Sequence, residues 1–339
     1  MAPKRESFFE RRRFLQSMAL AGVATAIGFE PPNATAQSKL ETTRIRLPQH
    51  PGICTAPFYV AEELLRADGL SVQYVKIPGA GHIYTTMAAG ETDLAVAFIA
   101  PFAIQVDQNK PIVMLAGIHP GCYEVFATNG IRSVRDLKGR RVSIPEQNGT
   151  HHLFIATIVS HIGLDPKKDI AWVVQPPDES MRQLAEGKID ALVGFPPVPQ
   201  ELRAKKIGHV ILNSGIDKPW SQYFCCVVAG RRDFVNKHPV ATKHAVRAIL
   251  KANALCATQP EQTARFLVDR GFTASYDHAL QTMREIPYAR WRDFSAEDSV
   301  RYFALRLQEL GFIKSSPKAL LARGTDWRFL EELKKELKS

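Results

Sequence analysis

The sequence predicts an α/β protein with two lobes, each built on a mainly parallel sheet flanked by helices. The chain has 339 residues, which is too long for one compact core and suits two lobes. Its apolar content of 45% is enough for a full core to be buried. Its central part alternates short apolar strands with helices, and this order of elements occurs twice. After residue 228 the pattern becomes helical.

The first unit ends in a short, wholly apolar strand, which is typical of a strand buried on both faces of a parallel sheet. Its second helix is followed by Gly90, where a left-handed C-terminal cap costs glycine little. The pattern predicts strands at 43–47, 70–77 and 94–98 and helices at 56–67 and 82–89.

The second unit repeats this order. We expect Asp178 to act as the N-cap of its second helix, after two prolines. The predicted strands are 141–144, 170–174 and 191–195, and the first helix is 150–162. Four residues of the first unit, Gly90, Asp93, Val96 and Phe98, recur at identical spacing as Gly187, Asp190, Val193 and Phe195. The repeat indicates two similar lobes with right-handed β-α-β crossovers.

The chain is expected to cross between the lobes twice, near 121–128 and near 221–229. The predicted division is a first lobe over 37–122, a second lobe over 123–224, and a return to the first lobe over 225–339. Amphipathic helices predicted at 239–257, 261–269, 276–286, 296–310 and 327–337 should cover the first lobe. Two crossings act as hinges, so a ligand that contacts both lobes favours closure.

The first 36 residues have the three parts of an export signal. Arg11-Arg12-Arg13-Phe14-Leu15 precedes an apolar stretch at 18–29 and the small-residue end Ala34-Thr35-Ala36. This order resembles a twin-arginine signal, so we expect cleavage after Ala36 and a soluble periplasmic protein. The apolar stretch is too short to span a bilayer. The alternative is a basic helix followed by an ordinary core helix.

The charge distribution argues against a nucleic-acid partner. The net charge is +10, and removal of residues 1–36, with five basic and three acidic residues, lowers it to +8. These charges are dispersed and form no basic helix interleaved with aromatic residues.

The five cysteines, at 54, 122, 225, 226 and 256, are too few and too scattered for a disulfide scaffold. Without a C-x-x-C spacing they are expected to be buried small hydrophobic residues. Cys225 and Cys226 should point to opposite faces of a strand. No metal site and no cofactor are predicted, because the adjacent pair His151-His152 would need further metal ligands that the sequence does not identify.

In open parallel sheets, ligands bind beyond the carboxyl ends of the strands. This rule selects the loops at 48–55, 78–82, 98–101, 145–151 and 195–199 and the stretch 220–223. The loop before the helix at 150 is the strongest candidate, since helix N-termini attract anions. The candidate binding residues are His50, Thr55, Gly81, His82, Phe98, Tyr123, Gln147, Asn148, Gly149, Thr150, His151, Phe195, Trp220, Gln222 and Tyr223. For each aromatic residue, core packing is the alternative role.

These loops contain no lysine or arginine, which argues against a multiply charged ligand. A small organic anion, such as a sulfonate, carboxylate or aromatic acid, is favoured. Glu124, Glu146 and Asp178 lie near the loops and would suit an amine, so a pyrimidine or another amino-heterocycle is the alternative.

From about residue 43 to 324 the chain resembles periplasmic binding proteins of the nitrate/sulfonate/taurine class, which includes thiamine-pyrimidine binders. Three segments carry the resemblance: Ala56–Ala61 with Gly69-Leu70, Asp136–Val142, and Gly187–Pro196. It implies a two-lobed (type II-like) periplasmic-binding-protein fold, a monomer, and a permease partner in an ABC importer.

Two other functional classes stay open. The same family has an enzymatic branch, the pyrimidine synthases, which carry a cysteine-rich iron motif. The pair Cys225-Cys226 alone does not match that motif. Since the sequence contains no nucleophile elbow, H-E-x-x-H or P-loop, no catalytic residue is predicted. The other class is a sensory protein on the same lobes.

Overall fold

The computed structural model describes residues 39–50 and 52–337, so the predicted export signal lies outside the described residues. The described strands are β1 Arg44–Gln49, β2 Ser71–Lys76, β3 Leu94–Phe98, β4 Ile112–Pro120, β5 Glu124–Ala127, β6 Arg140–Ile144, β7 Ile170–Val174, β8 Ala191–Gly194, β9 His209–Asn213 and β10 Phe224–Arg231. Among these residues, no helix combines the length and the apolar character that a membrane crossing requires.

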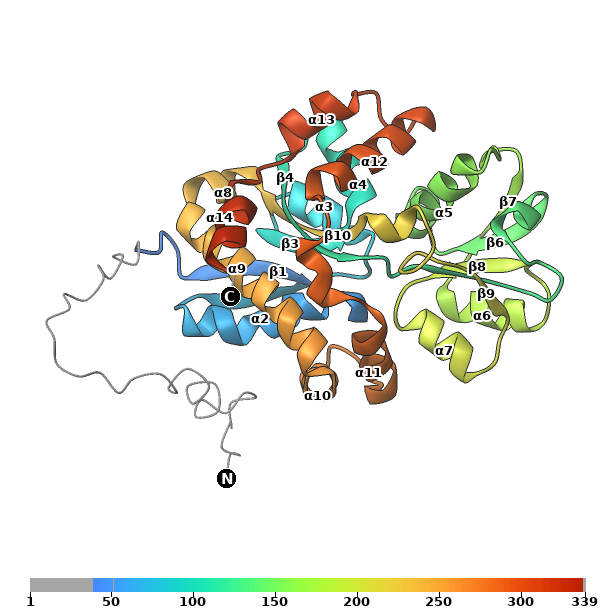
Figure 1. Cartoon of the computed structure of the whole chain (residues 1–339), viewed down its shortest axis with the longest axis horizontal. Coiled ribbons are helices and arrows are strands. Elements are labelled where there is room, and N and C mark those ends of the chain that lie inside the picture. Colours follow the sequence, from blue (N-terminus) through green and yellow to red (C-terminus); the bar gives the residue numbers. More distant parts are fainter. Residues whose placement is uncertain (1–38, 51, 338–339) are drawn as a thin grey trace, which may run out of the picture. The chain divides into compact units, whose positions relative to one another are not determined.

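The helices surround these strands (Figure 1). The α-helices are α2 Ala56–Ala67, α3 His82–Ala88, α4 Ile99–Asp107, α5 Thr150–His161, α6 Pro177–Ala185, α7 Val198–Ala204, α8 Arg232–Lys237, α9 Pro239–Thr258, α10 Pro260–Asp269, α11 Tyr276–Glu285, α12 Ala296–Glu309, α13 Pro317–Gly324 and α14 Arg328–Glu336. Short 3-10 helices are η1 Ile53–Thr55, η2 Val134–Leu137, η3 Trp220–Gln222 and η4 Tyr288–Arg292.

The strands form two groups. In the first, β1 pairs with β2 in parallel, and β10 lies between β3 and β4. The Asp93 N–H donates to the Arg46 carbonyl across 2.8 Å, which joins the start of β3 to β1. The second group is one sheet with the order β7-β6-β8-β5-β9 (Figure 1). We call the first group with its helices the first lobe, and the sheet β5–β9 with its helices the second lobe.

The chain passes from the first lobe to the second between Pro120 and Glu124 and returns between Asn213 and Phe224. Each crossing delivers a strand that runs antiparallel to its neighbours: β5 against β8 and β9, and β10 against β3 and β4. Whereas β1 with β2, and β6 with β7 and β8, pair in parallel, these two strands do not. They enter their sheets directly from the other lobe, without the crossover helix that parallel neighbours require.

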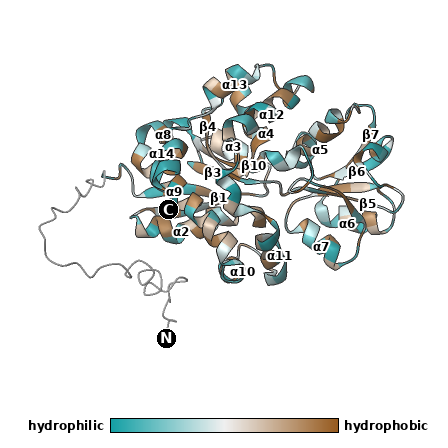
Figure 2. Cartoon of the chain, in the orientation of Figure 1, coloured by the Kyte–Doolittle hydropathy of each residue, from teal (hydrophilic) through white to brown (hydrophobic). Residues whose placement is uncertain are grey.

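The cores follow the apolar pattern of the sequence. Every residue of β3 and β4 is buried, and hydrophobic and hydrophilic residues alternate along the outer helices (Figure 2). Gly90 takes a left-handed backbone angle, with φ of +81°, which confirms its predicted cap, and its equivalent Gly187 does the same with φ of +68°. Asp178 lies inside the first turn of α6 and Pro176 takes the N-cap position, so that prediction is wrong.

The repeated aspartates make the same bonds in both lobes. The Asp93 carboxylate accepts from the backbone N–H, Nε and a terminal nitrogen of Arg46, at 2.8, 3.1 and 2.6 Å. The Asp190 carboxylate accepts from the same three groups of Arg141, at 2.8, 3.0 and 3.2 Å. The spacing found in the sequence therefore marks a duplicated ion pair between equivalent strands.

Candidate functional site

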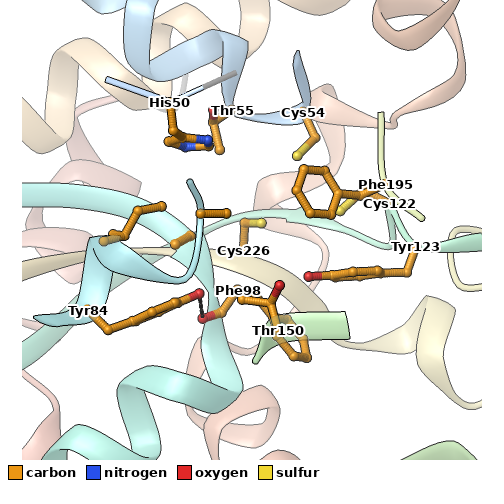
Figure 3. Close-up of a pocket in the computed structure, with 13 residues that line it drawn as sticks. His50, Cys54, Thr55, Tyr84, Phe98, Cys122, Tyr123, Thr150, Phe195 and Cys226 are labelled. Atoms are coloured by element: carbon orange, nitrogen blue, oxygen red, sulfur yellow. Dashed lines mark hydrogen bonds between the residues drawn. The ribbon is translucent and has the colours of Figure 1, made fainter. Parts of the chain in front are cut away.

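A pocket lies between the two lobes (Figure 3). It encloses about 310 Å³ of empty space, part of it open to solvent. Its lining residues are His50, Cys54, Thr55, Ala80, Ile83, Tyr84, Ala97, Phe98, Cys122, Tyr123, Thr150, Phe195 and Cys226. Tyr123, Thr150 and Phe195 come from the crossing and the second lobe, so both lobes are needed to form the walls.

The fold brings these side chains together at the carboxyl ends of strands, as the rule for open sheets predicts. Phe98 is the last residue of β3, Thr150 begins α5 beyond β6, and Phe195 follows β8. The Ile53 N–H lies 3.4 Å from the Pro196 carbonyl, which links the loop after β1 to the loop after β8.

His50 is a buried histidine that lines the pocket. It is 6% exposed, and neither ring nitrogen has a hydrogen-bond partner among the described residues. Tyr59 holds its backbone, because the hydroxyl accepts from the His50 N–H at 3.1 Å and donates to its carbonyl at 2.7 Å. Tyr59 therefore fixes the backbone of His50, while the ring lines the pocket with both nitrogens unpaired among the described residues.

Aromatic rings form the wall on the side of the second lobe. Tyr123 stacks on Phe154 with ring centroids 4.4 Å apart and meets Phe195 edge-on at 5.5 Å. His151 stacks on Phe195 at 5.0 Å, although it does not line the pocket itself. A wall of aromatic rings suits a flat ligand.

The residues that line the pocket carry no full positive charge near neutral pH. Burial lowers the pKa of His50 to about 4, and it lowers the pKa of His151 to about 4 as well. Burial also raises the pKa of Tyr84 and of Tyr123, so both hydroxyls stay protonated. Tyr84 donates to the Phe98 carbonyl at 3.1 Å. Among the described residues, no lysine or arginine lines this pocket.

The structure brings six of the predicted residues into the pocket lining: His50, Thr55, Phe98, Tyr123, Thr150 and Phe195. Gly81 lies just outside, where an added Cβ would come within 2.6 Å of a Glu146 carboxylate oxygen. His82, next in the chain, is exposed.

The remaining predicted residues do not line this pocket. Gln147 and Asn148 are exposed, and Gly149 takes the N-cap position of α5. The Asn148 N–H donates to His152 Nδ1 at 3.0 Å, so the loop bonds to its own helix.

Trp220, Gln222 and Tyr223 lie elsewhere. The Trp220 ring packs edge-on against His161. Gln222 and Tyr223 line a second, more open cavity, together with residues of η4 and the start of α12.

Sequence reasoning missed the thiols of the lining. Cys54, Cys122 and Cys226 belong to three separate parts of the chain, and local spacing gives no signal of their meeting. The prediction that Cys225 and Cys226 point to opposite faces is wrong, since their Sγ atoms are 3.9 Å apart. The register of β10 against β4 shifts on both sides of Cys226, and such a bulge breaks the alternation of side chains.

The comparison with solved structures defines the class of fold. The nitrate-binding protein NrtA of Synechocystis PCC 6803 superposes with a TM-score of 0.74 at 17% identity, covering 88% of this chain and 90% of that one. The alkanesulfonate-binding protein SsuA of Xanthomonas axonopodis pv. citri gives 0.70 at 14% identity, covering 85% and 100%. The chain has the fold of the periplasmic binding proteins.

The sequence comparison then gives the family. The model of the NMT1-like family matches residues 38–268, which is well over half of the chain, and the chain belongs to this family. The taurine-binding periplasmic protein of Escherichia coli (strain K12) is 25% identical over 198 residues. That match covers 58% of this chain and 61% of the relative, so the chain spans less than two thirds of that protein. All three similar proteins are named as binding proteins and not as enzymes.

Proposed function

We propose that this chain is the solute-binding component of an ABC importer. It holds a small organic molecule between its lobes and delivers it to a membrane permease. The ring nitrogens of His50 carry this proposal, since neither has a hydrogen-bond partner among the described residues. A buried polar group without a partner costs about 1–3 kcal/mol unless something bonds to it. Membership of the NMT1-like family and the names of the relatives support the transport role.

The ligand proposed first is a singly charged organic anion with a flat apolar body. Its body would lie against Tyr123 and Phe195. Its charged end would face Thr150, where the first N–H groups of α5 have no acceptor within the helix. A helix N-terminus supplies about half a positive charge, which suits one negative charge without lysine or arginine.

An uncharged amino-heterocycle is the second candidate. The observation that favours it is the absence of full positive charge from the described lining, together with a carboxylate of Glu146 next to Gly81. A neutral His50 can donate one hydrogen bond and accept another, which matches the edge of a pyrimidine.

Export by the twin-arginine signal at 1–36, cleavage near Ala36 and a monomeric state complete the proposal. Together they would place the pocket where a solute can reach it before the permease does.

A thermal-shift screen tests the ligand class. Sulfonates, carboxylates, aromatic acids and pyrimidines are each added to the purified protein, and a ligand raises the melting temperature in proportion to its occupancy. Stabilisation by aromatic acids supports the anion, whereas stabilisation by amino-heterocycles alone contradicts it. Chemical conversion of the ligand would contradict a binding role.

The compound that stabilises most is then titrated calorimetrically into two histidine variants. His50→Leu removes both ring nitrogens and should weaken binding at least about tenfold, the equivalent of about 1.4 kcal/mol. The matched control is His82→Ala, which removes an exposed histidine of the neighbouring loop and should leave affinity within about twofold. Equal affinity in both variants would contradict the site.

A further inference from the structure

Four buried side chains with sulfur or nitrogen donor atoms meet beside the pocket, and three of them line it. They are Cys54 of η1, His119 of β4, Cys122 after β4, and Cys226 of β10. One donor atom from each lies within 4.8 Å of the other three. Their exposed fractions are 4%, 0%, 8% and 3%, so no surface role accounts for them. All three cysteines are free thiols.

The His119 ring is oriented as in metal sites. Its Nδ1 lies 3.2 Å from the Pro120 carbonyl, which can only accept, so Nδ1 carries the hydrogen. Nε2 is then the ring nitrogen that can bind a metal ion when the ring is neutral, and it has no hydrogen-bond partner among the described residues. A ligating histidine commonly donates its other ring N–H to a backbone carbonyl in this way.

We propose that Cys54, His119, Cys122 and Cys226 bind one thiophilic metal ion, with Zn²⁺ as the representative of its class. Three thiolates and one imidazole form a set that Zn²⁺ takes in tetrahedral sites. Sulfur ligands also select Cu⁺ over the harder cations. With metal–ligand distances of about 2.3 Å to sulfur and 2.0 Å to nitrogen, tetrahedral donors lie roughly 3.5–3.8 Å apart. The observed separations need only side-chain adjustment to reach them.

The ion has a route to this site, because Cys54, Cys122 and Cys226 also line the pocket. Figure 3 draws their sulfur atoms on the side where Phe195 lies. The metal site goes beyond the proposed function and does not need the organic ligand, since none of its four donors comes from Tyr123, Thr150 or Phe195.

A disulfide is the competing outcome. Cys122 Sγ lies 3.2 Å from Sγ of Cys225, a cysteine outside the four. A Cys122–Cys225 disulfide would remove one ligand and leave the set incomplete.

The test uses the full chain, reduced and stripped of metal, with Zn²⁺ alone as the probe. Equilibrium dialysis with metal analysis should give about one Zn²⁺ per chain. Cys226→Ser should weaken binding at least about 100-fold, since loss of an outer partner alone costs about 10- to 100-fold. The matched control is Cys256→Ser, because Cys256 is equally buried and lies outside the four; it should bind as the wild type does.

Two further measurements keep the test decisive if a serine variant fails to fold. Co²⁺ bound to the wild-type protein should show thiolate-to-cobalt charge-transfer absorption, and His119→Gln should weaken binding as Cys226→Ser does. The proposal would be overturned if the wild-type protein bound Zn²⁺ no more tightly than Cys226→Ser does. A Co²⁺ spectrum without thiolate absorption, or a Cys122–Cys225 disulfide in the protein as isolated, would overturn it as well. Binding of the organic ligand is measured separately on metal-free protein, and its result tests the proposed function without testing the metal site.

Discussion

His50 combines three properties that distinguish it from the other histidines of the loops. It is buried, its backbone is clamped by Tyr59, and its ring nitrogens have no partner among the described residues. His82, in contrast, is exposed. The difference between these two histidines is one of packing, which the sequence around each does not reveal.

The burial of His50 predicts how stability depends on pH. Its pKa is about 4 in the folded chain and about 6.5 when unfolded. Between these values the unfolded state binds more protons than the folded state. The contribution of His50 to the free energy of unfolding is therefore fully present above pH 6.5 and is lost as the pH drops toward 4. At pH 5 the loss from His50 is about 2 kcal/mol.

Urea unfolding at pH 7 and pH 5 measures this loss, with His50→Gln as the comparison. The variant lacks the titrating ring, so its stability should fall less between the two pH values, by about 2 kcal/mol. His151 and His152, whose pKa values burial also lowers to about 4, contribute equally to both proteins. The same loss in wild type and variant would contradict the assignment.

At the scale of elements, the duplicated ion pairs differ in burial. The Asp93 side chain is 6% exposed and also contacts Arg231, whereas the Asp190 side chain is 18% exposed and pairs with an Arg141 that is 46% exposed. Breaking a buried pair costs about 3–5 kcal/mol, and an exposed pair contributes about 0–1 kcal/mol.

Asp93→Asn should therefore lower the free energy of unfolding by about 3 kcal/mol, and Asp190→Asn by about 1 kcal/mol. Chemical denaturation of the two variants in parallel measures both values. Each variant keeps the shape of the side chain and serves as the control for the other. Equal losses would mean that the two pairs do not differ as their burial indicates.

Much of the element order follows from local pattern. The helix Ala56–Ala67 and the strands Leu94–Phe98 and Ile170–Val174 have the predicted bounds, because apolar periodicity and flanking Gly and Pro act over a few residues. The direction of β5 and β10 could not be predicted this way, because strand direction depends on where the chain comes from. The bulge at Cys226 is likewise a product of pairing with β4.

The candidate site could be predicted only in part. The rule that ligands bind beyond strand ends led to Phe98, Thr150 and Phe195, since those ends converge in any such sheet. The rule failed to separate the side chains within a loop: Thr150 lines the pocket, whereas Gln147 and Asn148 are exposed and do not line it. The meeting of Cys54 with Cys226 is a contact between distant parts of the chain, beyond the reach of any local pattern.

At the scale of the whole molecule, Arg203 connects the lobes. On α7 of the second lobe, it donates to Glu124 of β5 at 2.6 Å and to Glu285 of α11 at 2.7 Å. Gln200 of α7 also donates to Glu285, at 2.9 Å. Since α11 packs with α9 and α10 of the first lobe, the bonds to Glu285 favour closed lobes.

Glu285→Gln should weaken ligand binding by up to about fivefold, because a partly exposed ion pair contributes at most about 1 kcal/mol. High salt should reduce the difference between variant and wild type, since it screens the pair. The control is Glu261→Gln, which removes an exposed pair with Arg284 that involves no residue of α7. Titration calorimetry at two salt concentrations measures the effect, and equal affinity of both variants at low salt would exclude this role for Glu285.

Small-angle X-ray scattering with and without the compound from the thermal-shift screen tests most directly whether the lobes close on a ligand. At saturation, the radius of gyration should fall, and the scattering profile should keep the mass of one chain. An unchanged radius of gyration at full occupancy, with affinity that survives His50→Leu, would contradict the account.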